Sequence, residues 1–366
     1  MVHDPRPAPT PTQRLVTQPL AYAALRTALT PAHVFPLPSV LSAARRMGRA
    51  FGGARFNASR VDRAAERVGV AFPEADADER RGLVLSSYEH LAMLGAELAV
   101  VPRLLSEDAW TEYIELAPLE HVMPMLVTDR PTLLLTAHAG NWEVIGYTMA
   151  LLGFSAHAIY RPLDLRPADA WVRQTRSRRG LSLLDKFGAM RSIPEIMLRG
   201  EAVAFVADQN AGERGLQVPF LGRLASSYKS IGLTAMQFNA NILVGQARRL
   251  PIPPGSSAPM RYRIEPADTF GPEDWADQPD PLFYITARYR RAIETMIRNA
   301  PEQYLWMHRI WKSRPRHERL DRPFPDALRE KLAALPWMTD DELERIVDRS
   351  ERDRAHLRDR GTTRLE

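Results

Sequence analysis

The chain has 366 residues, no cysteine and a formal net charge of +5. Hydrophobic residues make up 45% and charged residues 25%, a balance that is ordinary for globular proteins and excludes wholesale disorder. The lack of cysteine excludes disulfides, thiolate metal sites and a cysteine nucleophile, and it fits a reducing compartment.

The first part of the chain is predicted to be helical. Residues 1–15 are Pro-rich, so we expect a mobile segment there, and they lack the apolar core of a signal peptide. Residues 16–128 form the expected helical N-terminal region. Its helical patterns lie at 22–52, 57–70 and 77–98. The weakly charged stretch 16–44 is broken by four prolines, so we do not expect a spanning helix.

Residues 129–322 alternate short apolar runs with helical patterns, which is typical of an α/β domain. We expect a central mixed or mostly parallel sheet flanked by helices. The predicted strands lie at 132–137, 155–160, 202–208, 242–249 and 260–266. The predicted helices lie at 142–152, 168–178, 193–199, 228–239 and 282–299. Residues 323–366 carry dense mixed charge and predict either a solvated helix or a disordered tail.

One predicted loop is unusually long. It runs from Asp208 to Ser227, and a loop of that length inside a compact domain is usually functional or mobile. Its centre, "VPFLG", is apolar enough to line a lipid or acyl pocket, or else to pack on the core.

The main chemical candidate is His138, in the stretch "TAHAGNWEVIG". It follows a predicted buried strand, where ligands usually bind in open α/β sheets. Asn141 is a suitable cap for the next helix, which carries Glu143 near its start. Glu143 could fold back onto the imidazole of His138, hold its tautomer and stabilise the imidazolium. The alternative is a structural histidine.

No protein nucleophile accompanies this histidine. The sequence has no G-x-S-x-G, Walker, G-x-G-x-x-G or H-E-x-x-H motif. A histidine base would then act directly on a hydroxyl or amine of the substrate. Arg161 and Asp208 end the next two predicted strands and could complete the site, unless these strands simply end in polar residues at the surface.

The positive charge is concentrated in two stretches. Residues 161–200 hold nine basic against four acidic residues, and 281–322 hold ten against four. This excess indicates an anionic partner. Within the second stretch, 301–320 mixes aromatic and basic residues, which suits a lipid headgroup layer or an amphipathic helix with aromatics in the core. Nucleic acid is not expected, because no binding motif accompanies it.

Five motifs together resemble one family. They are "HAGNWE" (138–143), "YRP" (160–162), "ADQN" (207–210), "GLQVPFLGRLAS" (215–226) and "PEQYLWMHRIWKSRP" (301–315). In this order and spacing they resemble the late acyltransferases of lipid A biosynthesis, whose relatives include phosphatidylinositol mannoside acyltransferases. The segments "RFNASR" (55–60) and "AFPEA" (71–75) resemble weaker family features.

The resemblance implies an acyltransferase fold and a His-Glu dyad, with His138 as base, Glu143 orienting it, Arg161 on the oxyanion or a phosphate, and Asp208 in support. The matching motifs also suggest substrate-binding residues. These are Asn141, Tyr160, Gln209, Arg309 and Lys312. No metal or cofactor is expected.

The resemblance further implies an acyl-carrier-protein thioester as donor, with acyl-coenzyme A as the alternative, and a lipid A-type glycolipid acceptor. We expect a peripheral position at the cytoplasmic face of the inner membrane. Two alternatives stay open. One is another acceptor, such as a phosphatidylinositol mannoside, an ornithine lipid or a diffusible molecule; the other is a non-catalytic protein that binds anionic lipid.

Overall fold

A computed structural model describes residues 11–177, 180–256 and 258–365. At its centre lies a seven-stranded sheet in the order β1-β9-β8-β2-β5-β3-β4. Its strands are β1 (Ile114–Leu116), β2 (Thr132–Thr136), β3 (Ala156–Tyr160), β4 (Ser182–Asp185), β5 (Ala202–Val206), β8 (Asn241–Arg249) and β9 (Tyr262–Phe270). All neighbours pair in parallel except β8 and β9. The predicted α/β class with a mostly parallel mixed sheet is confirmed.

The five predicted strands all lie in this sheet, and two other strands of the sheet were not predicted. β1 comes from the region expected to be helical, and both it and β4 are short. The central strand β2 reads Thr-Leu-Leu-Leu-Thr and is buried on both faces, as a parallel strand covered by helices requires.

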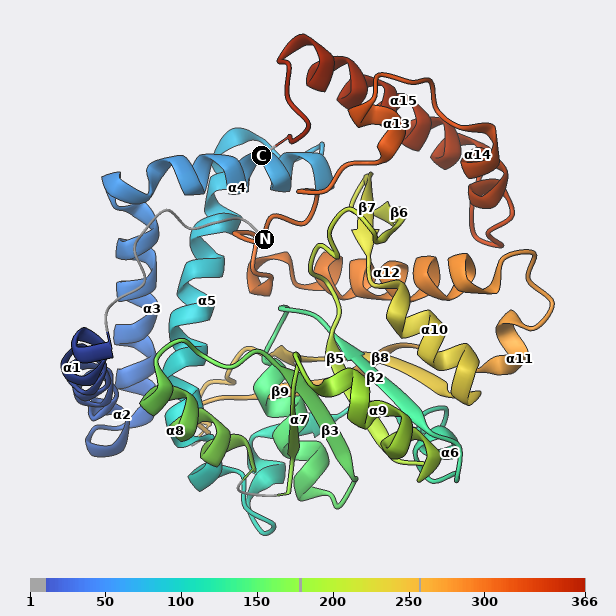
Figure 1. The fold of residues 1–366 in the computed structure, drawn as a ribbon. Helices are drawn as coiled ribbons and strands as arrows, with labels where there is room; N and C mark the ends of the chain where they lie inside the picture. The colour runs from blue at the N-terminus through green and yellow to red at the C-terminus, as the bar shows by residue number, and fades with distance from the viewer. Residues whose placement is uncertain (1–10, 178–179, 257, 366) are drawn as a thin grey trace.

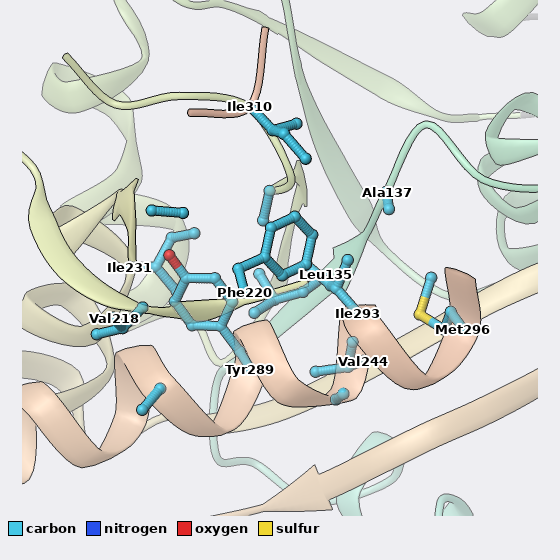
Figure 2. Close-up of a cluster of buried hydrophobic side chains, with 14 of the residues drawn as sticks. Leu135, Ala137, Val218, Phe220, Ile231, Val244, Tyr289, Ile293, Met296 and Ile310 are labelled. Carbon is cyan, nitrogen blue, oxygen red and sulfur yellow. The ribbon is translucent and has the colours of Figure 1, made fainter. Parts of the chain in front are cut away.

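Helices cover both faces of the sheet (Figure 1). Those that follow β1 in the chain are α6 (Met123–Leu126), α7 (Trp142–Leu151), α8 (Arg166–Ser177), α9 (Ala189–Leu198), α10 (Lys229–Phe238), α11 (Pro272–Trp275) and α12 (Pro281–Asn299). The largest core cluster lies on the α12 face, where Leu135 and Val244 of the sheet meet Tyr289 and Ile293 of α12 (Figure 2). The α7 face holds a smaller cluster around Leu134.

The N-terminal helices form their own side of the molecule (Figure 1). They are α1 (Pro11–Leu29), α2 (Pro31–Val34), α3 (Leu37–Gly53), α4 (Ala58–Ala71) and α5 (Ala77–Leu104). Helix α3 packs closely on α5 because Gly48 has no side chain: a Cβ there would lie 2.4 Å from the carbonyl oxygen of Tyr88. Of the segment 1–15 expected to be mobile, residues 1–10 lie outside the described residues and 11–15 begin α1.

Helix α5 is the one described helix long and apolar enough to cross a membrane by length and composition, which is weak evidence on its own. Its most apolar window is 56% buried inside the protein. A capping box at Asp76 and Glu79 starts the helix, because each side chain accepts a backbone N–H of the other residue.

The long predicted loop proved wrong in part. Residues 208–227 contain a hairpin of β6 (Leu216–Phe220) and β7 (Arg223–Ser227), whose turn residues Leu221 and Gly222 both have positive φ. Val218 and Phe220 are fully buried against α12, so this apolar stretch packs on the core and does not line a pocket (Figure 2).

The C-terminal residues are helical. α13 (Arg316–Arg319), α14 (Asp326–Ala333) and α15 (Asp340–Asp359) lie beside the β6–β7 hairpin (Figure 1). Arg314, which is fully buried, joins them by bonding Glu318 and Asp353. The preceding stretch 304–315 is not the amphipathic helix considered as an alternative, although Trp306 and Trp311 are fully buried as that alternative expected.

A buried carboxylate ties α5 to the sheet. Glu97 has no exposed side-chain surface and accepts hydrogen bonds from Arg249 at 2.7 Å, from the Tyr262 hydroxyl and from Asn141. Such a pair holds two elements in register, and removing one partner leaves the other charged and buried.

We expect Arg249→Met to lower the free energy of unfolding by about 3–5 kcal/mol, because the fully buried carboxyl group of Glu97 would lose its ion-pair partner. Urea unfolding measures this loss. Arg199→Met is the matched control, since Arg199 pairs at the surface with Glu195 and Glu201, and it should leave the stability close to that of wild type. Equal small losses in both variants would contradict the claim that the Glu97 pair fixes α5.

Candidate active site

The site begins at the turn that follows β2. His138 lies two residues beyond the strand, and Gly140 has a φ of +59°. A Cβ at Gly140 would lie 2.1 Å from the carbonyl oxygen of Ala247, so the turn requires glycine. The backbone N–H of Leu305 donates to the His138 carbonyl at 3.0 Å, which brings the loop after α12 onto this turn.

Asn141 caps α7 as predicted. Its Oδ1 accepts the backbone N–H groups of Glu143 and Val144 at 3.2 and 3.1 Å, while its Nδ2 donates to Glu97. The side chain is 1% exposed, and Asn141 lies beneath the site. Asn141 is not part of the cavity wall, and its contact with substrate stays a prediction.

Asp208, at the end of β5, is the partner of His138. The His138 Nδ1 and the Asp208 Oδ1 lie 2.8 Å apart, and the His138 backbone N–H donates to the same oxygen at 3.3 Å. The Tyr304 hydroxyl donates to the other oxygen at 3.2 Å. Parallel strands β2 and β5 are neighbours, so the two residues meet at one edge of the sheet.

This carboxylate is fully buried and charged. Burial pushes the pKa of Asp208 upward, but the charge and hydrogen bond of His138, and then the nearby His308, outweigh burial and hold the pKa well below its usual range. Burial and the neighbouring Asp208 raise the pKa of Tyr304 well above its usual value, so Tyr304 stays a proton donor.

Glu143 forms no hydrogen bond or ion pair with His138. Arg176, in the last turn of α8, donates from Nε to Glu143 at 2.7 Å, and the Trp142 indole donates at 3.1 Å. The expected His138–Glu143 contact is thus replaced by His138–Asp208. The physical reason is that α7 directs Glu143 toward Arg176 of α8. Burial alone would lower the pKa of Arg176, but the charge and hydrogen bond of Glu143 outweigh burial and raise it.

A second histidine lies against the pair. The rings of His308 and His138 are edge to face with centroids 4.4 Å apart, and the His308 Nδ1 is 3.7 Å from Asp208. Among the described residues, His138, Asp208 and His308 form the one group whose ligand atoms lie close enough to hold a metal ion. The 2.8 Å separation between His138 and Asp208 is equally that of an ordinary hydrogen bond.

His138 lines a cavity of about 840 Å³. The predicted residues Tyr160, Arg161 and Gln209 line it near the carboxyl ends of the strands, together with Glu143. Most of the remaining wall is apolar and comes from the sheet, α7 and the segment before β2. An apolar cavity with a few convergent polar groups is the usual form of a small-molecule site.

Arg161 has no hydrogen-bond or ion-pair partner in the described part of the chain, so its charge is available to a ligand. Arg309 and Lys312 follow His308 on the same loop but lie outside the cavity wall. Sequence reasoning missed Arg176 and His308. Arg176 sits in an undistinguished arginine-rich helix, whereas His308 lies inside a motif that was singled out and could have been found there.

Residues 12–313 match a family described as bacterial lipid A biosynthesis acyltransferase. The chain belongs to this family. It is therefore an acyltransferase, and the predicted resemblance is confirmed. The match covers the sheet, His138 and the His308 loop, and it stops before α13.

Curated relatives agree with the family match. The chain is 25% identical over 256 residues to the lipid A biosynthesis palmitoleoyltransferase of Escherichia coli K12, covering 69% of this chain and 78% of that protein. It is 27% identical over 268 residues to the lauroyltransferase of the same organism, covering 71% and 82%. A lipid A biosynthesis acyltransferase of Shigella flexneri matches at 25%.

The lowered pKa of Asp208 predicts a pH-dependent effect of Asp208→Asn. A carboxylate whose folded pKa lies below its unfolded value, about 3.9, contributes stability above that value and loses it as the pH falls through the folded pKa. We expect Asp208→Asn to cost about 1–3 kcal/mol at neutral pH, and the difference from wild type to shrink below about pH 4. Urea unfolding across this range measures it. A difference independent of pH would contradict the charged state of Asp208.

Proposed function

We propose that the chain is an O-acyltransferase that moves a fatty acyl group from an acyl-carrier-protein thioester to a hydroxyl of a lipid A-type glycolipid precursor. One observation carries this proposal: the His138 imidazole, held by the buried Asp208, borders a mostly apolar cavity of about 840 Å³. A base beside a space suited to a fatty chain is what acyl transfer to an alcohol requires.

The hydrogen bond to Asp208 decides which nitrogen is the base. A charged carboxylate can only accept, so the Nδ1 of His138 carries the proton and Nε2 is left with its lone pair. Asp208 thus takes the orienting role that the sequence suggested for Glu143. This is the arrangement of the histidine and aspartate in a serine-protease triad, with the substrate alcohol in place of the serine.

In the proposed reaction the acceptor oxygen attacks the thioester carbon while its proton passes to the His138 Nε2. The tetrahedral intermediate carries its negative charge on the former carbonyl oxygen, where the amide of Gln209 and Arg161, which has no partner among the described residues, are available. The carbon–sulfur bond then breaks, and the leaving thiolate takes the proton from the imidazolium. No acyl-enzyme forms, and neither metal nor cofactor enters a step.

Glu143 and Arg176 form the second polar wall of the cavity. We propose that this pair fixes the Arg176 guanidinium where a carbonyl or phosphate oxygen of a substrate reaches it. The Glu143 carboxylate pairs with the Arg176 guanidinium when no substrate is bound. A bound substrate oxygen then shares the guanidinium with Glu143. Tyr160 borders the same region.

Charge and exposed apolar groups support the proposed donor and location. Carrier proteins are acidic, and the basic excess of residues 161–200 and 281–322, which includes Arg309 and Lys312, suits one; acyl-coenzyme A is the alternative donor. Phe51 and Phe56 are half or more exposed on the N-terminal helices, next to exposed arginines. This supports peripheral attachment to anionic lipid at the cytoplasmic face of the inner membrane.

Family membership favours an enzyme over the non-catalytic lipid-binding alternative. The choice of acceptor rests on the family and its relatives, and lipid mass spectrometry of a deletion strain separates the candidates. An underacylated lipid A species supports the proposed acceptor. An underacylated phosphatidylinositol mannoside or ornithine lipid would instead support one of the other acceptors.

We expect His138→Ala to abolish transfer from acyl-carrier protein, and Asp208→Asn to lower kcat by about 10⁴-fold, the loss seen when the triad aspartate of a serine protease is replaced by asparagine. Purified protein with radiolabelled acyl-carrier thioester measures both. His121→Ala is the matched control, because His121 is exposed and outside the cavity. Transfer at the wild-type rate by His138→Ala would end the proposed mechanism.

We expect the double variant Phe51→Ser, Phe56→Ser to weaken binding to vesicles of phosphatidylglycerol and phosphatidylethanolamine by tenfold or more. Fully burying one phenylalanine contributes about 1.5–3 kcal/mol. Co-sedimentation of the full chain measures this, with Leu198→Ser, another exposed apolar side chain, as the control. Equal binding by both variants would contradict attachment through the N-terminal helices.

A further inference from the structure

The strand register places two small residues side by side in the cavity wall. Ala158 of β3 pairs with Ala204 of β5, and both are partly accessible although neither strand is at the edge of the sheet. On one side Ala158 pairs with Leu183 of β4, and on the other Ala204 pairs with Leu134 of β2. Leu134 pairs in turn with Leu243. The row across five strands is therefore Leu-Ala-Ala-Leu-Leu, and all five residues line the cavity.

Two alanines between leucines form a trough in the surface of the sheet. Neighbouring strands lie about 4.8 Å apart, so the missing side-chain volume at this pair is roughly one hydrocarbon chain wide. Ala156 continues it, because residues two apart on a strand share a face. Helix α7 covers the trough with Met149 and with Gly146, where the Leu181 side chain lies 3.1 Å from the position that a Cβ would take.

The two ends of the trough differ in chemistry. The carboxyl ends of the strands carry His138, Arg161 and Gln209. At the amino ends the cavity is bordered by Leu126, just before β2, and Phe154, just before β3. From Asp208 back to Ala204 is four residues, or about 13 Å at about 3.3 Å per residue.

We infer that this trough, with Ala158 and Ala204 as its base and Phe154 at its far end, sets the length of the acyl chain that the protein accepts. The inference rests on the proposed function, because that function places the thioester end of the acyl chain at His138. A straight chain whose thioester carbon lies at His138 extends past the alanine pair toward Phe154. Its length is then limited by the distance between the reacting centre and the amino ends of the strands.

Ala204→Leu and Ala158→Leu test this, because each places a branched side chain halfway along the trough. They fill an existing space, so the fold should be retained, which circular dichroism checks. Phe154→Ala tests the opposite end by lengthening the space. Ala276→Leu is the matched control, since Ala276 is exposed and outside the cavity.

The binding measurement displaces fluorescent cis-parinaric acid with saturated fatty acids from octanoate to stearate. We expect both Ala→Leu variants to bind stearate about tenfold or more weakly while octanoate binding is nearly unchanged, since added methylenes in a filled space are strongly unfavourable. Phe154→Ala should shift preference to longer chains. Equal losses for short and long chains, or no change in any variant, would overturn the inference.

A parallel transfer assay with acyl-carrier thioesters of the same lengths separates this inference from the proposed function. If length selectivity in binding shifts as expected but wild type transfers no acyl group, the trough stands and the transferase proposal falls. If wild type transfers acyl groups and the variants keep its length profile, the transferase proposal stands and the trough does not set the length.

Discussion

The hydrogen bond between His138 and the fully buried Asp208 is the interaction on which the site depends. A buried carboxylate is unfavourable unless cations or donors surround it. Here the Asp208 oxygens accept hydrogen bonds from the His138 imidazole, from the His138 backbone N–H and from the Tyr304 hydroxyl, and His308 lies close by. Three separate segments must therefore come together before the charge is compensated, and their meeting fixes the imidazole.

The rest of the fold holds those segments in place. β2 and β5 are adjacent parallel strands, which brings His138 and Asp208 to one edge of the sheet. The loop that carries Tyr304 and His308 is held from both ends: Leu305 bonds to the His138 carbonyl, and Ser313 bonds to Asn210 at 3.0 Å. Beyond it the buried Arg314 joins the C-terminal helices, which lie outside the family match, to the same loop.

Much of this could be predicted from the sequence. The apolar runs at 132–137, 155–160 and 202–208 indicated strands, and the rule that ligands bind at their carboxyl ends placed His138, Arg161 and Asp208 at one edge. The structure brings His138, Arg161 and Gln209 to one cavity, with Asp208 directly behind His138. These residues all lie just after the end of a predicted strand. The end of a strand can be predicted from the local pattern of apolar and polar residues.

Other features depend on contacts distant in sequence. Glu143 is five residues from His138 and so was the natural partner, whereas the actual partner is seventy residues away and is adjacent only because β5 lies beside β2. Ala158 and Ala204 are 46 residues apart, and only the strand register shows that they lie side by side. The β6–β7 hairpin was missed because Pro219 is an unusual strand residue and the preceding glycines suggest a loop.

The most direct test of this account is the tautomer of His138. Long-range nitrogen–proton correlation spectra of protein labelled with ¹⁵N-histidine report which ring nitrogen carries the proton, and the His138→Ala spectrum assigns the signals. We expect the neutral ring to carry its proton on Nδ1 in the wild type, and a mixture of tautomers in Asp208→Asn. A wild-type ring protonated on Nε2 would contradict the account, because the nitrogen assigned as the base would already hold a proton.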